Sequence, residues 1–248
     1  MSSLDDARTR LRKIGQEHVL HFADELSDAQ HHALEAQLAA LDLESVPSWV
    51  ETYVRKRPAS GAPADLRPVR AYPLNPTDPS RPWDRAAAMR AGEDMLRAGK
   101  VAVFTVAGGQ GSRLGFDGPK GVFPGGAVTG KPLFVCIAEW IVAARRRYGA
   151  PIPWCVMTSP LNHKETVSFF EAHSHCGVPK DDVIFFQQGV MPSFDAATGR
   201  LLLANKGELA TNPDGHGGSL RAMHTSGALA QLKRRGVEHI SYTQIDNP

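Results

Sequence analysis

Strands and helices alternate along the second half of the sequence, and this alternation limits the fold more strongly than any other feature. Residues 101–106 form an unbroken run of β-branched and apolar side chains, as expected of a strand buried on both faces. The predicted strands lie at 101–106, 154–158, 183–186 and 240–245, and the predicted helices start at Pro132 or span 163–172 and 218–235. This order predicts an α/β fold with a Rossmann-like, mostly parallel, doubly wound sheet. Ligands of such sheets bind at the carboxyl ends of the strands.

The first part of the sequence predicts a separate helical domain. Leu4, Ala7 and Leu11 recur at helical spacing, and Ser27 and Gln30 have the spacing of a capping box before a second helix. Seven prolines between residues 57 and 83 remove backbone donors and disfavour helix, which predicts an extended connector. The predicted organisation is a helical N-terminal domain at 1–56, a proline-rich connector at 57–83 and an α/β domain at 84–248.

Charge, hydropathy and cysteine content exclude several classes of protein. Lys and Arg total 28 and Asp and Glu total 26, and the basic residues are scattered, which disfavours nucleic-acid binding. No run reaches the ~18 consecutive apolar residues of a membrane helix. The charged N-terminus does not resemble a secretory or lipidation signal. Three widely spaced cysteines fit neither a disulfide framework nor a zinc site. We therefore expect a reduced, cytoplasmic protein.

A glycine-rich loop follows the first strand of the predicted sheet. Gly108, Gly109 and Gly111 allow the backbone to approach a ligand closely, and their amides could surround phosphate oxygens. Arg113 offers a planar fork for phosphate, and Lys120 a mobile point charge.

The loop does not match two common nucleotide-binding motifs. A Walker loop places Ser or Thr after its lysine, whereas Gly121 follows Lys120. A dinucleotide-binding loop needs a third glycine where Leu114 stands, so a dinucleotide-dependent oxidoreductase is disfavoured.

The run AGGQGSRLGFDGPKG resembles the nucleotide-binding signature of uridylyltransferases that make UDP-sugars, above all the UDP-N-acetylglucosamine pyrophosphorylases. Further matching segments occur in the same order along the chain. They are Gly15–Gln16–Glu17–His18, Phe185–Phe186–Gln187–Gln188–Gly189, Pro213–Asp214–Gly215–His216–Gly217–Gly218 and residues 242–247. The resemblance implies uridylyl transfer from UTP to a sugar 1-phosphate.

The resemblance also implies a role for individual residues. The residues expected to contact UTP are Val106, Ala107, Gly108, Gly109, Gln188 and Gly215, with Gln188 on the uracil. Lys120 is expected to bind the phosphates and stabilise the transferring group, and Arg113 to contact the leaving pyrophosphate. His216 is expected to contact the sugar phosphate or the nucleotide, and Asp246 to hold Mg²⁺, for which a carboxylate is a suitable hard ligand.

Two positions depart from the acetylglucosamine enzymes. His216 stands where they carry Asn and is more similar to the UDP-glucose pyrophosphorylases, and Ser112 stands where Thr is usual. N-acetylglucosamine 1-phosphate is the expected sugar substrate, and glucose 1-phosphate the alternative. The matching segments continue to the end of the sequence, so we expect the N-terminal part of a longer enzyme. A non-catalytic nucleotide-binding fragment is the alternative to an enzyme.

Overall fold

A computed structural model describes residues 3–56 and 65–246 of the chain. They form two compact units, each described below by itself. One unit comprises Met1–Pro68 and Val190–Pro213, and the other Val69–Gly189 and Asp214–Pro248. None of the helices in the described ranges is long and apolar enough to cross a membrane.

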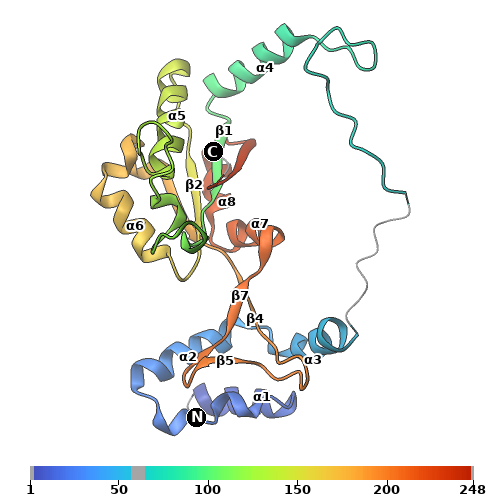
Figure 1. The fold of residues 1–248 in the computed structure, drawn as a ribbon, viewed down its shortest axis with the longest axis vertical. Coiled ribbons are helices and arrows are strands. Elements are labelled where there is room, and N and C mark those ends of the chain that lie inside the picture. Colours follow the sequence, from blue (N-terminus) through green and yellow to red (C-terminus); the bar gives the residue numbers. More distant parts are fainter. Residues whose placement is uncertain (1–2, 57–64, 247–248) are drawn as a thin grey trace. The chain divides into compact units, whose positions relative to one another are not determined.

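Four parallel strands form the sheet of the α/β unit (Figure 1). The strands are β1 (Val101–Val106), β2 (Trp154–Thr158), β3 (Val183–Gln187) and β8 (His239–Gln244), in the order β3-β2-β1-β8. Val106 is in register with Met157 on one side and with Gln244 on the other. The predicted Rossmann-like parallel sheet is therefore confirmed.

Helices cover both faces of this sheet. On one face α5 (Leu133–Tyr148) and α6 (His163–Ala172) place Phe134 and Phe170 against Trp154 of β2. On the other face α7 (Gly215–Thr225) and α8 (Ala228–Arg234) share an apolar core with Phe104 of β1. Because alternate residues of a strand point to opposite faces, the apolar run of each strand supplies both cores.

The predicted helix at 218–235 is wrong in one respect, because the structure contains two helices there. Helix α7 ends at Thr225 and α8 begins at Ala228. Gly227 between them has φ 81°, a left-handed conformation that interrupts helical hydrogen bonding.

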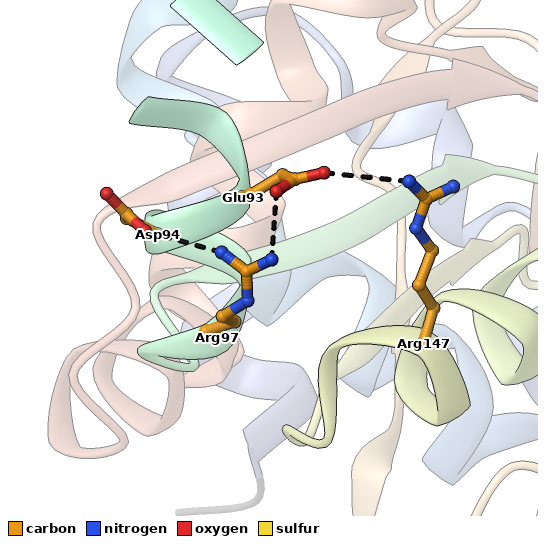
Figure 2. A network of polar contacts seen from close by, with 4 residues as sticks. All are labelled: Glu93, Asp94, Arg97 and Arg147. Atoms are coloured by element: carbon orange, nitrogen blue, oxygen red, sulfur yellow. Dashed lines mark hydrogen bonds and ion pairs between the residues drawn. The ribbon is translucent and has the colours of Figure 1, made fainter. Parts of the chain in front are cut away.

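Helix α4 (Arg85–Arg97) is attached to α5 by the polar network in Figure 2. Glu93 accepts a hydrogen bond from Arg97 at 2.8 Å and pairs with Arg147 of α5 at 3.5 Å. Asp94 pairs with Arg97 at 3.4 Å. The Asp84 side chain caps the helix by accepting from Ala87 N–H.

Short turns complete the α/β unit. They are η5 (Ser112–Leu114), η6 (Lys120–Val122), η7 (Ser174–Gly177) and η8 (Lys180–Asp182).

The helical unit has its own apolar core. Its elements are α1 (Ser3–Lys13), η1 (Glu17–Leu20), η2 (Ala23–Glu25), α2 (Asp28–Ala40), η3 (Leu43–Ser45), α3 (Val46–Trp49) and a π-helical turn, η4 (Val50–Arg55). Leu11, Leu34 and Leu38 are almost fully buried in this core. The predicted capping box is present, since Ser27 and Gln30 bond each other's backbone amides at the start of α2. These observations confirm helical structure in the first part of the chain.

The structure divides the chain differently from the predicted domains at residues 190–213. This segment contains β4 (Val190–Pro192), β5 (Leu203–Asn205), β6 (Glu208–Leu209) and β7 (Thr211–Pro213), which pair as β4–β7 and β5–β6. Leu201 and Leu209 are buried in the core of the helical unit, and Gln16 bonds the backbone of Gly199 and Leu201. The segment therefore belongs to the helical unit. Its strands are too short to show a hydrophobic period, which is why the sequence did not predict this.

The proline-rich connector falls only in part within the described residues. Residues 57–64 lie outside them, and residues 65–83 contain neither helix nor strand. A small folded contact occurs there, because Trp83 Nε1 donates to Pro73 O and Arg81 lies over the Tyr72 ring.

Candidate functional site

The carboxyl ends of the four parallel strands meet at one edge of the sheet. The glycine-rich loop leaves β1 there, Gln188 follows β3, and Asp246 follows β8. Ile245 N–H donates to Val106 O at 3.0 Å, and Gln188 N–H donates to Thr158 O at 2.8 Å. Residues from three distant parts of the sequence are thus brought together where the fold places ligands.

The glycine-rich loop folds back on itself. Gly111 N–H donates to Gly118 O at 2.9 Å, and Lys120 N–H donates to Gly109 O at 3.1 Å. The Lys120 side chain lies beside Gly109, since a Cβ there would be 3.8 Å from Lys120 Cε. Within the described part of the chain, the amides of Gly108 and Gly109 donate no hydrogen bond. They are available to an anionic ligand.

Lys120 and Asp246 form an ion pair across the site. Lys120 Nζ lies 3.0 Å from Asp246 Oδ2, and the two side chains are 19% and 52% exposed. The hydrogen bond from Lys120 lowers the pKa of Asp246, and the charge of Arg113 adds a smaller effect. Arg113 itself is exposed in η5. Two predicted cations and the predicted metal ligand therefore share one electrostatic environment.

The Gln188 amide packs against the backbone of the loop. A Cβ on Gly108 would come within 2.5 Å of Gln188 Oε1, so only glycine fits at that position without a shift. Gly215 is the first residue of α7 and has φ 74°, with open space where its Cβ would be. His216 lies in the first turn of α7, but its side chain is not among those described, so its predicted contact stays a prediction.

The sequence did not predict two polar residues near this edge. Asn162 is fully buried and bonds the carbonyls of Ala107 and Gly109. Asp214 precedes α7, and its side chain packs closely against Gly189 and Gly218. Within the described residues its buried Oδ1 has no hydrogen-bond partner. For Asn162 the only signal in the sequence is its residue type, since Asn often caps helices. For Asp214 it is the position within a segment that resembles the family.

Comparison with known proteins agrees with this architecture. The family model described as UTP–glucose-1-phosphate uridylyltransferase matches residues 74–248. The chain is 35% identical over 260 residues to a probable UDP-N-acetylglucosamine pyrophosphorylase of Schizosaccharomyces pombe, covering 98% of this chain and 53% of that protein. It is 31% identical to UDP-N-acetylglucosamine diphosphorylase 2 of Arabidopsis thaliana, covering 96% of this chain and 49% of that protein.

A solved structure shows the same relationship. The crystal structure of uridine diphosphate N-acetylglucosamine pyrophosphorylase from Trypanosoma brucei, in complex with an inhibitor, is 28% identical with a TM-score of 0.72. The match covers all of this chain and 52% of that one. The chain spans about half the length of the curated relatives it matches. On the extent of these matches, the chain belongs to the UTP–glucose-1-phosphate uridylyltransferase family.

Proposed function

We propose that this chain serves uridylyl transfer from UTP to a sugar 1-phosphate, with N-acetylglucosamine 1-phosphate as the sugar substrate. The observation that carries the proposal is the meeting of the glycine-rich loop, the Lys120–Asp246 ion pair and Gln188 at the carboxyl edge of the sheet. This edge offers free backbone amides, a cation and an amide side chain together.

Binding of UTP uses two neighbouring parts of this edge. The amides of Gly108 and Gly109 and the Lys120 ammonium bind phosphate oxygens, with Val106 and Ala107 at the start of the loop. Gln188 has both a donor and an acceptor for the uracil edge, and Gly215 leaves room for the base. Arg113 contacts the leaving pyrophosphate, since a guanidinium matches phosphate geometry.

The reaction needs positioning more than proton transfer. The phosphate of a sugar 1-phosphate is already largely ionised at neutral pH, because its second pKa is about 6. Its oxygen attacks the α-phosphorus of UTP, and the bond between the α-phosphorus and the bridging oxygen breaks as pyrophosphate leaves. Lys120 and Arg113 stabilise the negative charge on the phosphates as this happens.

Mg²⁺ fits the donor chemistry of the same edge. The Asp246 side chain is 52% exposed, so it keeps accessible oxygen besides its bond to Lys120. Mg²⁺ is commonly held by one or two carboxylates together with substrate phosphates. Within the described residues no group of three His, Cys, Asp or Glu side chains could hold a metal, so UTP and water would complete the coordination. When bound, Mg²⁺ supplies charge neutralisation of the phosphates.

The choice of N-acetylglucosamine 1-phosphate is supported by the relatives. The relatives from Schizosaccharomyces pombe and Arabidopsis thaliana, at 35% and 31% identity, carry names that include N-acetylglucosamine. The family model carries a glucose name, and His216 resembles the glucose enzymes, so glucose 1-phosphate is the alternative substrate. The contact of His216 with the sugar phosphate is part of what we propose here.

The test is a panel of sugar 1-phosphates with UTP, in which pyrophosphate release reports turnover and calorimetry reports UTP binding. We expect UTP to bind more tightly than CTP or ATP, and Gln188→Ala to weaken UTP binding and narrow that preference. Gln187→Ala is the matched control, because it removes the neighbouring exposed amide. UTP binding without pyrophosphate release would support the non-catalytic nucleotide-binding alternative. Equal binding of ATP and UTP would exclude the uridylyl assignment.

We also propose a reducing, cytoplasmic compartment and no nucleic-acid partner. All three cysteines are free thiols. Burial raises the pKa of Cys155 to about 12 and of Cys176 to about 11, so neither forms a reactive thiolate at neutral pH. These buried thiols are compatible with a protein that needs no disulfide for its fold.

A further inference from the structure

Asn162 is a buried polar residue behind the glycine-rich loop that has no role in the proposed contacts with UTP. Its side chain is inaccessible to solvent and makes three hydrogen bonds. Oδ1 accepts from Ser159 N–H at 2.8 Å, and Nδ2 donates to Ala107 O at 2.9 Å and to Gly109 O at 3.2 Å. The Nδ2 group therefore donates both of its hydrogen bonds to the loop, which lies more than fifty residues away in sequence.

Helix capping does not account for this residue. Asn162 occupies the N-cap position of α6, where an Asn side chain ordinarily accepts from an amide in the first turn. Here the cap position makes no such hydrogen bond. The Asn162 side chain instead connects the β2–α6 turn, through Ser159, to the loop after β1.

The two bonds from Nδ2 fix the orientation of two peptide planes. In a trans peptide the C=O of one residue and the N–H of the next point in opposite directions. With Ala107 O directed at Asn162, the Gly108 amide points away from it. With Gly109 O directed at Asn162, the Gln110 amide likewise points away. Glycine leaves these planes free to rotate unless something holds them.

The same contact reaches the cation of the site. Gly109 O accepts from Lys120 N–H at 3.1 Å as well as from Asn162. A shift of the 109–110 peptide would therefore move the backbone of Lys120, whose ammonium is paired with Asp246. Asn162 thus links the two groups assigned to phosphate binding, the loop amides and the lysine.

We propose that Asn162 is a positioning residue that holds the Gly108 amide and Lys120 in the geometry that binds the phosphates of UTP. It acts through the loop and does not touch the nucleotide. The identity of the ligand, UTP, rests on the proposed function. The statement that Asn162 fixes the conformation of the loop does not depend on it. The alternative is that Asn162 only fills space in the buried region. In that case its shape would matter, and its two donated hydrogen bonds would not.

The test compares Asn162→Asp with Thr166→Ala in the 248-residue chain. Asn162→Asp keeps the shape and the acceptor for Ser159 but removes both donors. Thr166 is equally buried, lies on α6, and among the described residues its hydroxyl has no hydrogen-bond partner, so Thr166→Ala controls for lost stability. We expect Asn162→Asp to weaken UTP binding at least ~10-fold, since misplacing a positioned group by about 1 Å costs up to ~10²-fold. Uridine binding, measured by NMR titration, should change less than twofold, because uridine carries no phosphate.

A second measurement needs no nucleotide. Amide NMR signals of Gly108, Gly109 and Lys120 should shift or broaden in Asn162→Asp and stay in place in Thr166→Ala. If the unmodified chain binds no UTP, the proposed function fails, while these signals still decide whether Asn162 holds the loop. Unchanged loop signals, or equal losses of UTP and uridine affinity, overturn the proposal. If Asn162→Asp does not fold, Asn162→Ser replaces it, because the serine side chain is too short to donate to Ala107 O and Gly109 O. The same UTP, uridine and NMR measurements then apply.

Discussion

At the scale of single residues, the ion pair of Lys120 and Asp246 is the central contact of the candidate site. They are 126 residues apart in sequence and 3.0 Å apart in space. Their ion pair holds the lysine side chain beside Gly109 of the loop. Because the Lys120 side chain is only 19% exposed, its charge is screened less by water than that of a surface lysine.

We expect Lys120→Ala to lower kcat for pyrophosphate release by at least ~10²-fold, the usual cost of removing one group that stabilises developing charge. Folding should be retained, because the residue lies in a short turn at the surface of the site. The pKa of Asp246 should rise toward its ordinary value once the lysine is gone. Lys131→Ala is the control, since Lys131 precedes α5 and pairs with Glu139 of that helix. A folded Lys120→Ala variant with nearly unchanged kcat would remove this residue from the mechanism.

Gly108→Ala tests the contact between the loop and the Gln188 side chain, which we propose to bind uracil. The added methyl group would come within 2.5 Å of Gln188 Oε1, so the amide must move. We predict at least ~10-fold weaker UTP binding by calorimetry, since displacing a positioned group by about 1 Å costs up to ~10²-fold. Gly92→Ala in α4 has open space at its Cβ and should leave UTP binding unchanged. Equal affinities for the two variants would show that Gly108 tolerates a side chain.

The sequence predicted where the motif residues lie in the fold, but it did not predict the residues that support them. Gly108, Lys120 and Gln188 stand in recognisable segments, and all three lie at the predicted edge of the sheet. Asn162 precedes a predicted helix, where Asn is common as a cap, so nothing local distinguishes it. Its bonds to Ala107 and Gly109 depend on the packing of β1 beside β2, which only the folded chain specifies.

At the scale of elements, continuous apolar runs were the reliable signal. The strands at 101–106 and 154–158 and the helix at 163–172 have the bounds predicted from the sequence. The helix predicted at 218–235 is interrupted by the left-handed Gly227, and one glycine within a helical pattern does not by itself mark a break. The segment 190–213 escaped prediction because its strands have only two or three residues each.

A cluster of charged side chains connects three elements on the α/β unit, and its centre is Asp182. Its carboxylate forms an ion pair with Arg145 of α5 at 2.7 Å and accepts a hydrogen bond from Arg235, which follows α8, at 2.8 Å. Arg145 and Asp182 are 18% and 16% exposed, so the pair is largely withdrawn from water. Removing the carboxylate would leave the two guanidinium groups with their bonds to the carbonyls of Ile152 and Asp181 but without the opposite charge.

We predict that Asp182→Ala lowers the free energy of unfolding by about 2–3 kcal/mol, less than the full cost of breaking a completely buried pair. Urea denaturation measures this change. Glu238→Ala removes the exposed pair with Lys100 and should lower the free energy of unfolding much less, because water screens an exposed pair. UTP affinity should be the same in both folded variants, because neither residue contacts the loop. Similar stability losses for the two variants would contradict this account of burial.

At the scale of the whole molecule, every described candidate site residue falls in one unit. The loop, Gln188, Gly215 and Asp246 all belong to the α/β unit, whereas the helical unit has a separate core that includes residues of the segment 190–213. The uridylyltransferase family model begins at residue 74, close to the start of the α/β unit at Val69. The nucleotide-binding chemistry proposed for this chain therefore depends on the packing of the α/β unit.

The outer edge of β8 gives the chain a surface that can associate. Among the described residues β8 pairs only with β1, and Ile240 is 38% exposed on this strand. Trp140 of α5 is 76% exposed beside a hollow that Val103 and Ile137 also line. An edge strand with apolar residues nearby is a template for pairing with another chain.

We therefore predict that the sedimentation coefficient of the 248-residue chain rises with concentration. Ile240→Lys should suppress the rise, because a charge on an edge strand opposes pairing. Val128→Lys places the same charge at a position 97% exposed in a loop and should leave the association unchanged, which separates the effect of the edge from that of net charge. A chain that stays monomeric at all concentrations, or equal suppression by both lysine variants, would show that β8 does not drive association.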